Sequence, residues 1–79
     1  VIIDVRTEDE YNERHIENSI LMTLDTINES VANEKINSKD AYVIVYCKSG
    51  NRSKQAQELL NKLGYTNVYN LGSINNWQG

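Results

Sequence analysis

Residues 42–53 read Tyr-Val-Ile-Val-Tyr-Cys-Lys-Ser-Gly-Asn-Arg-Ser, and a helical pattern follows up to Gly64. Residues 42–46 are all β-branched or aromatic without alternation, which is typical of a strand covered on both faces in a parallel sheet. After residue 53, apolar side chains recur at helical spacing, at Ala56, Leu59, Leu60 and Leu63. Gly64 can end this helix in the left-handed conformation. The pattern predicts a strand, a cysteine at its carboxyl end, and a loop that leads into a helix.

The loop formed by residues 47–53, called here the Cys47 loop, has three features that favour an anion. The first turn of a helix leaves backbone N–H groups unpaired and carries a partial positive charge. Gly50 permits backbone angles barred to other residues, so successive N–H groups can curl around one sulfur or oxygen atom. Lys48, Arg52 and Lys54 add positive charge without an intervening Asp or Glu. These features predict a Cys47 thiolate with a pKa below about 8.5, the usual value for cysteine.

Composition limits the class of protein. The chain has 79 residues, one Cys, one His and a net charge of −3. We expect one small domain, since a chain of this length buries only about 60% of its unfolded surface. One Cys cannot form an internal disulfide, so we expect a reducing compartment, the cytoplasm. One Cys and one His are too few ligands for a zinc site, and we expect no metal and no cofactor. We find neither a signal peptide nor an apolar run long enough to span a membrane.

Charge is unevenly distributed along the chain. Residues 1–40 contain four Lys or Arg and ten Asp or Glu, whereas residues 41–79 contain four Lys or Arg and one Glu. The positive half includes the Cys47 loop, but it lacks the basic stripe and stacking aromatics that nucleic acid requires. We therefore expect a small anionic ligand, no nucleic acid and no membrane partner. The oligomeric state stays open.

Four segments have the apolar character of strands, and helical patterns separate them. The segments are residues 1–5, 19–22, 42–46 and 67–71. Their alternation with helices predicts an α/β fold with a parallel, doubly wound sheet of about four strands and helices on both faces. In such a sheet the ligand crevice lies beyond the carboxyl ends of the strands. We expect this crevice to bring together three residues, Arg6, Cys47 and Gly72.

Three shorter helical segments are expected between and after these strands. Thr7 and Glu10 fit a capping box that begins an acidic helix ending near Arg14, and its charges over residues 8–13 are most simply a solvated face. Ser73 can cap a last short helix that ends at Trp77. A further apolar stripe at helical spacing precedes the central strand, at Leu24, Ile27 and Val31.

Four motifs of this chain occur together in one known family. Residues 47–53 match Cys-x-x-Gly-x-Arg-Ser, and residues 3–6 end a strand with Asp-x-Arg. The segment 15–20 is similar to His-Ile-x-x-Ala, and residues 65–72 with Trp77 are similar to a closing strand, a Gly turn and a Trp. Over nearly its whole length the chain thus resembles the rhodanese-like domains, which are single-domain sulfurtransferases.

The chain departs from the family pattern at three turns. Arg14 stands where Gly is usual, Glu17 where Pro is usual, and Ser73 where a second Gly is usual. None of these residues belongs to the Cys47 loop, so the departures leave its chemistry intact. We expect residues 1–79 to form a single rhodanese-like domain that lacks the family's first strand and helix.

The resemblance implies an enzyme with thiosulfate sulfurtransferase activity. Cys47 would take a sulfane sulfur from a small anionic donor such as thiosulfate, hold it as a persulfide, and pass it to a thiol, cyanide or a protein acceptor. Lys48 and Arg52 would attract the donor. The other candidate substrate-binding residues of the loop are Ser49, Gly50, Asn51 and Ser53, with the last three acting mainly through backbone donors.

Residues outside the loop have simpler interpretations. Asp4 and Arg6 are candidates for the wall of the crevice, as scaffold rather than as catalysts. His15 is better explained as a hydrogen-bonding residue at a turn than as a general base, because thiolate chemistry needs no separate base. The remaining aromatic residues of interest are explained by core and edge packing: Tyr42, Tyr46 and Trp77.

Two other functions compete with sulfur transfer by an enzyme. A cysteine phosphatase or arsenate reductase also has a Cys loop at a helix start, but its signature places five residues between Cys and Arg. Here four residues separate Cys47 from Arg52, and the chain lacks the expected acidic loop residue. A non-catalytic module that carries a persulfide or binds a partner fits the same sequence and stays open.

Overall fold

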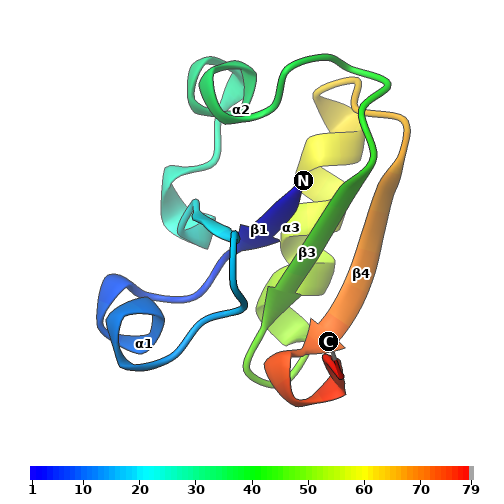
Figure 1. The fold of residues 1–79 in the computed structure, drawn as a ribbon. Coiled ribbons are helices and arrows are strands. Elements are labelled where there is room, and N and C mark those ends of the chain that lie inside the picture. Colours follow the sequence, from blue (N-terminus) through cyan, green and yellow to red (C-terminus); the bar gives the residue numbers. More distant parts are fainter. Residues whose placement is uncertain (79) are drawn as a thin grey trace.

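A four-stranded parallel sheet forms the centre of the fold in the computed structural model, which describes residues 1–78. The strand order is β2-β1-β3-β4, and each neighbouring pair is parallel. The strands are β1 (Ile2–Asp4), β2 (Ile20–Leu21), β3 (Val43–Cys47) and β4 (Val68–Ser73). Figure 1 shows β3 and β4 side by side, with α3 behind them. This topology confirms the α/β fold with a parallel sheet.

Within the described residues, three α-helices and two 3-10 turns connect and follow the strands. The helices are α1 (Glu8–Glu13), α2 (Glu29–Lys35) and α3 (Asn51–Lys62). The 3-10 turns are Leu24–Thr26 and Ile74–Asn76. None of the helices within residues 1–78 has the length and apolar character needed to cross a membrane.

The helical stripe expected from Leu24 to Val31 is divided into two elements, a 3-10 turn and α2. Asn28 separates them because its backbone is extended and its side chain accepts the N–H of Val31 at 2.9 Å, so it acts as the N-cap of α2. The expected capping box of α1 is confirmed. The Thr7 hydroxyl accepts the Glu10 N–H at 3.3 Å, and Glu10 accepts the Thr7 N–H at 3.1 Å.

β4 extends further than expected and contains a β-bulge. Val45 of β3 pairs with Asn70, whereas the next residue, Tyr46, pairs with Gly72, so Leu71 is the additional residue. Gly72 has a φ of 87°, and its N–H donates to the Asn70 side chain at 2.8 Å. Gly72 therefore lies inside β4 and not beyond its end. Ser73 caps the final 3-10 turn, as expected, by accepting the N–H of Asn75 at 3.0 Å.

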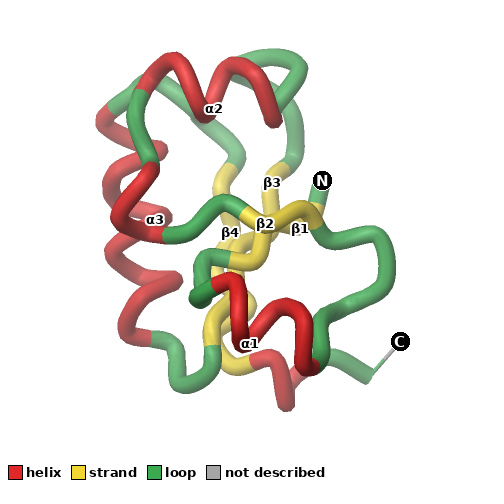
Figure 2. Tube along the Cα trace, turned by 90° about the vertical axis from the view of Figure 1, so that its left-hand side faces the viewer, coloured by secondary structure: helices red, strands yellow, loops and turns green. Residues whose placement is uncertain are grey.

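The two faces of the sheet are covered unequally. Figure 2 shows α3 along one side of the strands. On this face, α2 and α3 enclose the main core: Ile3, Val5, Met22, Ala32, Ile36, Val43, Val45, Cys47, Ala56, Leu60, Tyr65 and Val68. The opposite face has a smaller buried cluster, consisting of Ile16, Tyr46 and Ile74. α1 buries none of its own side chains and lies near the carboxyl ends of the strands (Figure 1).

A buried hydrogen-bond network joins this second face to the end of β1. The Tyr46 hydroxyl donates to Asp4 Oδ2 at 2.7 Å, accepts the N–H of Ile16 at 3.1 Å and lies 3.1 Å from Ser19 Oγ. Burial is the largest cause of the raised pKa of Tyr46, so this hydroxyl stays protonated. The Arg6 side chain forms an ion pair with Asp4, with Nη2 2.7 Å from Oδ2. Tyr46 is therefore a polar connector as well as a core residue.

Replacing Tyr46 by Phe tests this network. We expect Tyr46→Phe to lower the free energy of unfolding by about 1–3 kcal/mol, because it leaves the buried N–H of Ile16 and Asp4 Oδ2 without the hydroxyl. Tyr69→Phe on β4 is the matched control, since Tyr69 is 52% exposed and should change the stability little. Urea unfolding of both variants measures the difference. Equal stabilities of the two variants would contradict the role of the Tyr46 hydroxyl.

Candidate active site

Cys47 is the last residue of β3, and its side chain is completely buried. Its Sγ accepts the N–H of Gly50 at 2.9 Å and lies 3.4 Å from Ser53 Oγ. Gly50 is the N-cap of α3 and has a φ of 104°, which is the left-handed conformation expected from the sequence. A Cβ at Gly50 would lie 3.7 Å from Gly72 Cα, so the Cys47 loop closely approaches β4. Neither Cys47 nor Gly72 lines the cavities found beside the loop, so the crevice expected to join them with Arg6 stays a prediction.

The pKa of Cys47 is lowered from its usual value by opposing effects. Burial is the largest single effect and raises the pKa, because a thiolate is poorly solvated inside the protein. The Ser53 hydroxyl and the backbone N–H groups of Ser53, Gly50 and Ser49 favour the thiolate, and together they outweigh the burial. The predicted direction is confirmed. Its cause lies mainly in hydrogen bonds inside the loop.

Ser53 contributes a side-chain hydroxyl that the sequence interpretation did not assign. This hydroxyl is 3.1 Å from the carbonyl oxygen of Gly50 and 3.4 Å from Cys47 Sγ, and both the serine and the cysteine are fully buried. A serine hydroxyl has one hydrogen. When Cys47 is a thiol, its S–H can donate to Ser53 while Ser53 donates to Gly50. When Cys47 ionises, the serine hydrogen can turn to the sulfur.

The three cations expected around Cys47 have different environments in the structure. Arg52 forms a bidentate ion pair with Glu10 of α1, with Nη1–Oε1 at 2.7 Å and Nη2–Oε2 at 3.0 Å. The expectation that Glu10 belongs to a purely solvated face was therefore wrong, because the capping box places its carboxylate beside the start of α3. Lys48 and Lys54 are exposed. Only Lys48 of these two lysines lines a cavity next to the site.

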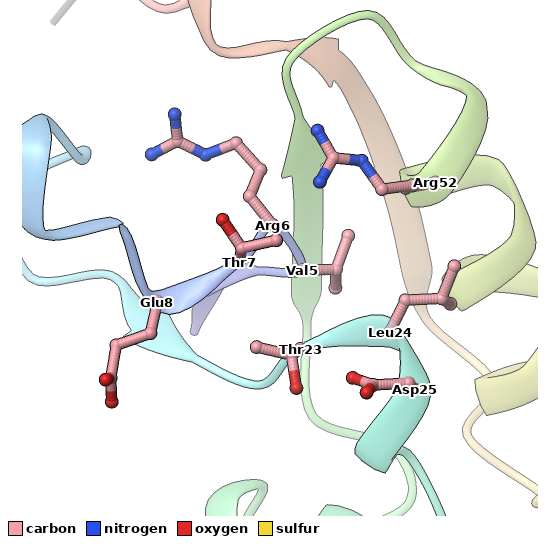
Figure 3. A pocket seen from close by; sticks show the side chains of 8 residues that line it. All are labelled: Val5, Arg6, Thr7, Glu8, Thr23, Leu24, Asp25 and Arg52. Carbon is pink, nitrogen blue, oxygen red and sulfur yellow. The ribbon is translucent and has the colours of Figure 1, made fainter. Parts of the chain in front are cut away.

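Two cavities lie beside the loop, and Arg6 borders both. The larger, called here the large cavity, has a volume of about 570 Å³ and is lined by Val5, Arg6, Thr7, Glu8, Thr23, Leu24, Asp25 and Arg52. Figure 3 shows the Arg6 and Arg52 side chains in the upper part of the view, above the apolar side chains of Val5 and Leu24. The small cavity, of about 150 Å³, is lined by Arg6, Glu10, Glu13, Arg14, Lys48, Ile74 and Asn75. Lys48 and Arg52 thus face different cavities.

Of the two residues expected at the crevice wall, Arg6 lines both cavities, whereas Asp4 lines neither and supports Arg6 from behind. Asp4 is fully buried, and its hydrogen bond raises the pKa of Arg6, which is nearly buried itself. Arg6 also donates to the carbonyl oxygen of Arg14, which holds the segment after α1. Arg6 lines both cavities, so it forms part of the wall of each. Its positive charge is compensated by Asp4.

Some residues singled out from the sequence lie away from Cys47. His15 is exposed, its Nδ1 is 2.7 Å from the carbonyl oxygen of Tyr11, and the two rings stack 3.8 Å apart. This agrees with a structural role. Asn51 is the exposed first residue of α3, and no hydrogen bond joins it to Sγ within residues 1–78. In the same residues, no three His, Cys, Asp or Glu side chains gather as a metal site would require.

The fold and the loop define a class of protein. It is a small parallel α/β domain whose cysteine lies at the end of a central strand, with backbone donors and a helix amino terminus around the sulfur. The family model of the rhodanese-like domain matches residues 1–79, and the chain belongs to this family.

Known relatives agree with this assignment. The chain is 38% identical over 72 residues to the thiosulfate sulfurtransferase PspE of Escherichia coli, covering 91% of this chain and 68% of that protein. It is 35% identical over 79 residues to the thiosulfate sulfurtransferase GlpE of Coxiella burnetii, covering 99% of this chain and 71% of the relative. A solved rhodanese with anions from E. coli superposes with a TM-score of 0.88 at 36% identity, covering 96% of this chain and 88% of that chain. The chain is a sulfurtransferase-type enzyme.

The hydroxyl of Ser53 provides a test of how the thiolate is stabilised. Ser53→Ala should raise the pKa of Cys47, because one donor to the thiolate is lost. The rate of Cys47 alkylation rises with the thiolate fraction, so its midpoint against pH measures this pKa. Ser49→Ala is the control, since Ser49 acts through its backbone N–H and should leave the midpoint in place. An unchanged midpoint in Ser53→Ala would exclude the hydroxyl as a donor.

Proposed function

We propose that the protein transfers a sulfane sulfur through a persulfide on Cys47. In the first step the Cys47 thiolate attacks the outer sulfur of a donor such as thiosulfate. A new S–S bond forms to Cys47, the S–S bond of thiosulfate breaks, and sulfite leaves with the electron pair of the broken bond. The observation that carries this proposal is the Gly50 N–H directed at Cys47 Sγ at 2.9 Å, at the start of α3.

In the second step an acceptor removes the outer sulfur. A thiolate, cyanide or the thiolate of another protein attacks this sulfur, and Cys47 leaves again as a thiolate. The same features support both steps, since Cys47 is a nucleophile in the first and a leaving group in the second. A lowered pKa favours the thiolate in each role, although it also makes the nucleophile less reactive.

Roles for the rest of the loop follow from where its groups lie. The backbone N–H groups of Ser49, Gly50 and Ser53 stabilise negative charge on Cys47, and the same groups are suited to hold the outer sulfur of a persulfide. Because Cys47 has no exposed surface, we propose that neighbouring side chains move to admit the donor.

Thiosulfate is the proposed donor because two relatives carry it in their names and because cations border the small cavity. Lys48, Arg6 and Arg14 line this cavity together with two carboxylates, Glu10 and Glu13, and its volume of about 150 Å³ suits a small anion. We propose the cytoplasm as the compartment, since the single Cys of the chain must stay reduced to act as a nucleophile. We also propose that residues 1–79 act as one domain.

Mass spectrometry of the intact protein tests the first step. After incubation with thiosulfate, the protein should gain the mass of one sulfur atom, and cyanide should return it to its original mass. Cys47→Ser is the control variant, because it lacks the nucleophile and should gain nothing. Circular dichroism of the variant confirms that it is folded.

The other functions predict different results in the same experiment. A cysteine phosphatase would leave the mass unchanged in thiosulfate and would hydrolyse an aryl phosphate. A persulfide carrier without turnover would gain one sulfur but release no thiocyanate catalytically when thiosulfate and cyanide are both present. Sulfur gain by the Cys47→Ser variant would end the covalent proposal.

A further inference from the structure

Glu10 is held in place by two sets of hydrogen bonds. On one side, its Oε1 accepts both the N–H and the hydroxyl of Thr7 at 3.1 Å. On the other side, its two oxygens accept Nη1 and Nη2 of Arg52 at 2.7 and 3.0 Å. Because both Thr7 and Arg52 donate to this carboxylate, the Glu10 side chain has little freedom to rotate. It connects α1 to Arg52, which is the second residue of α3 and lies within the Cys47 loop.

This contact occupies the part of Arg52 that would bind an anion. A guanidinium binds an oxyanion most strongly through two parallel N–H groups, and here Nη1 and Nη2 are both directed at Glu10. The hydrogen bond from Arg52, followed by that from Thr7, lowers the pKa of Glu10 to about 2. Glu10 is therefore charged at any pH at which Cys47 reacts, and the pair persists there.

The remaining positive charge near the loop is also limited by Glu10. Lys48 lines the small cavity, but Glu10 and Glu13 line it too. The Arg6 charge is compensated by Asp4 within the ion pair at 2.7 Å. The site thus offers an incoming donor less positive charge than the sequence of the Cys47 loop indicates.

We propose that Glu10 determines the charge selectivity of the Cys47 site by masking Arg52. While Glu10 holds both terminal nitrogens of Arg52, the site distinguishes weakly between anionic and neutral reagents. Removing the Glu10 charge releases Arg52, which then attracts anions to Cys47. For sulfur donors this inference rests on the proposed function, but the masking itself concerns any reagent that reaches Cys47.

Alkylation of Cys47 measures this selectivity without requiring sulfur transfer. Iodoacetate and iodoacetamide carry out the same reaction on a thiolate, forming a C–S bond and releasing iodide, but only iodoacetate is charged. Cys47 is the only cysteine of the chain, so intact mass reports its alkylation alone. The ratio of the two rate constants cancels changes in the pKa of Cys47, because both reagents depend equally on the thiolate.

Glu10→Gln is the decisive variant, since Gln is also accepted at this position of a capping box. We expect the iodoacetate-to-iodoacetamide ratio to rise about threefold to tenfold at low salt, and the rise to shrink at high salt. Asp9→Asn is the matched control. It removes the same charge from the same exposed turn of α1, and its ratio should stay at the parent value.

A double-mutant cycle separates masking from a simple through-space charge. Glu10→Gln should raise the ratio only while Arg52 is present, so adding it to Arg52→Gln should have little effect. A ratio unchanged in Glu10→Gln, or raised equally in the Arg52→Gln background, would overturn the proposal.

Sulfur donors of different charge extend the test to the proposed reaction. Glu10→Gln should raise kcat/KM for thiosulfate, a dianion, more than for benzenethiosulfonate, a monoanion that releases a sulfinate. If neither donor adds sulfur to the parent protein, the proposed sulfur transfer fails while the alkylation ratios still decide the role of Glu10. Equal losses of kcat/KM with both donors in Glu10→Gln would assign Glu10 to scaffolding only and overturn the proposal.

Discussion

The buried carboxylate of Asp4 requires hydrogen-bond donors, and the arrangement of the rest of the structure depends on the residues that provide them. Arg6 provides its Nε and Nη2, and Tyr46 of β3 adds its hydroxyl at 2.7 Å. Because Tyr46 also accepts the N–H of Ile16, the network joins β1, β3 and the segment after α1. The path of the chain out of β1 is thereby fixed, and with it the position of Glu10 beside α3.

The electrostatics of the site depend on directional contacts more than on the number of charges. Counting Lys48, Arg52 and Lys54 indicates a strongly positive loop, yet Arg52 is paired with Glu10 and Lys54 borders neither cavity. The donors that favour the thiolate are short-range, and they come from the loop itself. A sulfur atom can thus be stabilised as an anion inside an acidic protein.

How much the sequence could predict depended on whether the cause was local. The strand before Cys47, the left-handed Gly50 and the Thr7–Glu10 capping box follow from short patterns, and the structure contains all three. The Glu10–Arg52 pair joins residues 42 positions apart, and no periodicity links them. The bulge that brings Gly72 into β4 depends on pairing with β3, which a single strand does not reveal. The start of α2 could have been predicted from Asn28, a favourable N-cap residue, but the apolar stripe on both sides of it was interpreted as one helical segment.

Ser53 gives the site a small and fast response to the charging and discharging of Cys47. Its hydroxyl lies between the carbonyl oxygen of Gly50 and Cys47 Sγ, so a rotation about one C–O bond changes which of them receives the hydrogen. The dipoles around the sulfur otherwise belong to a backbone that is already in place. Little reorganisation energy is then required when negative charge moves onto or off the sulfur. Cys47 can therefore change between its charged and neutral states without a movement of the backbone.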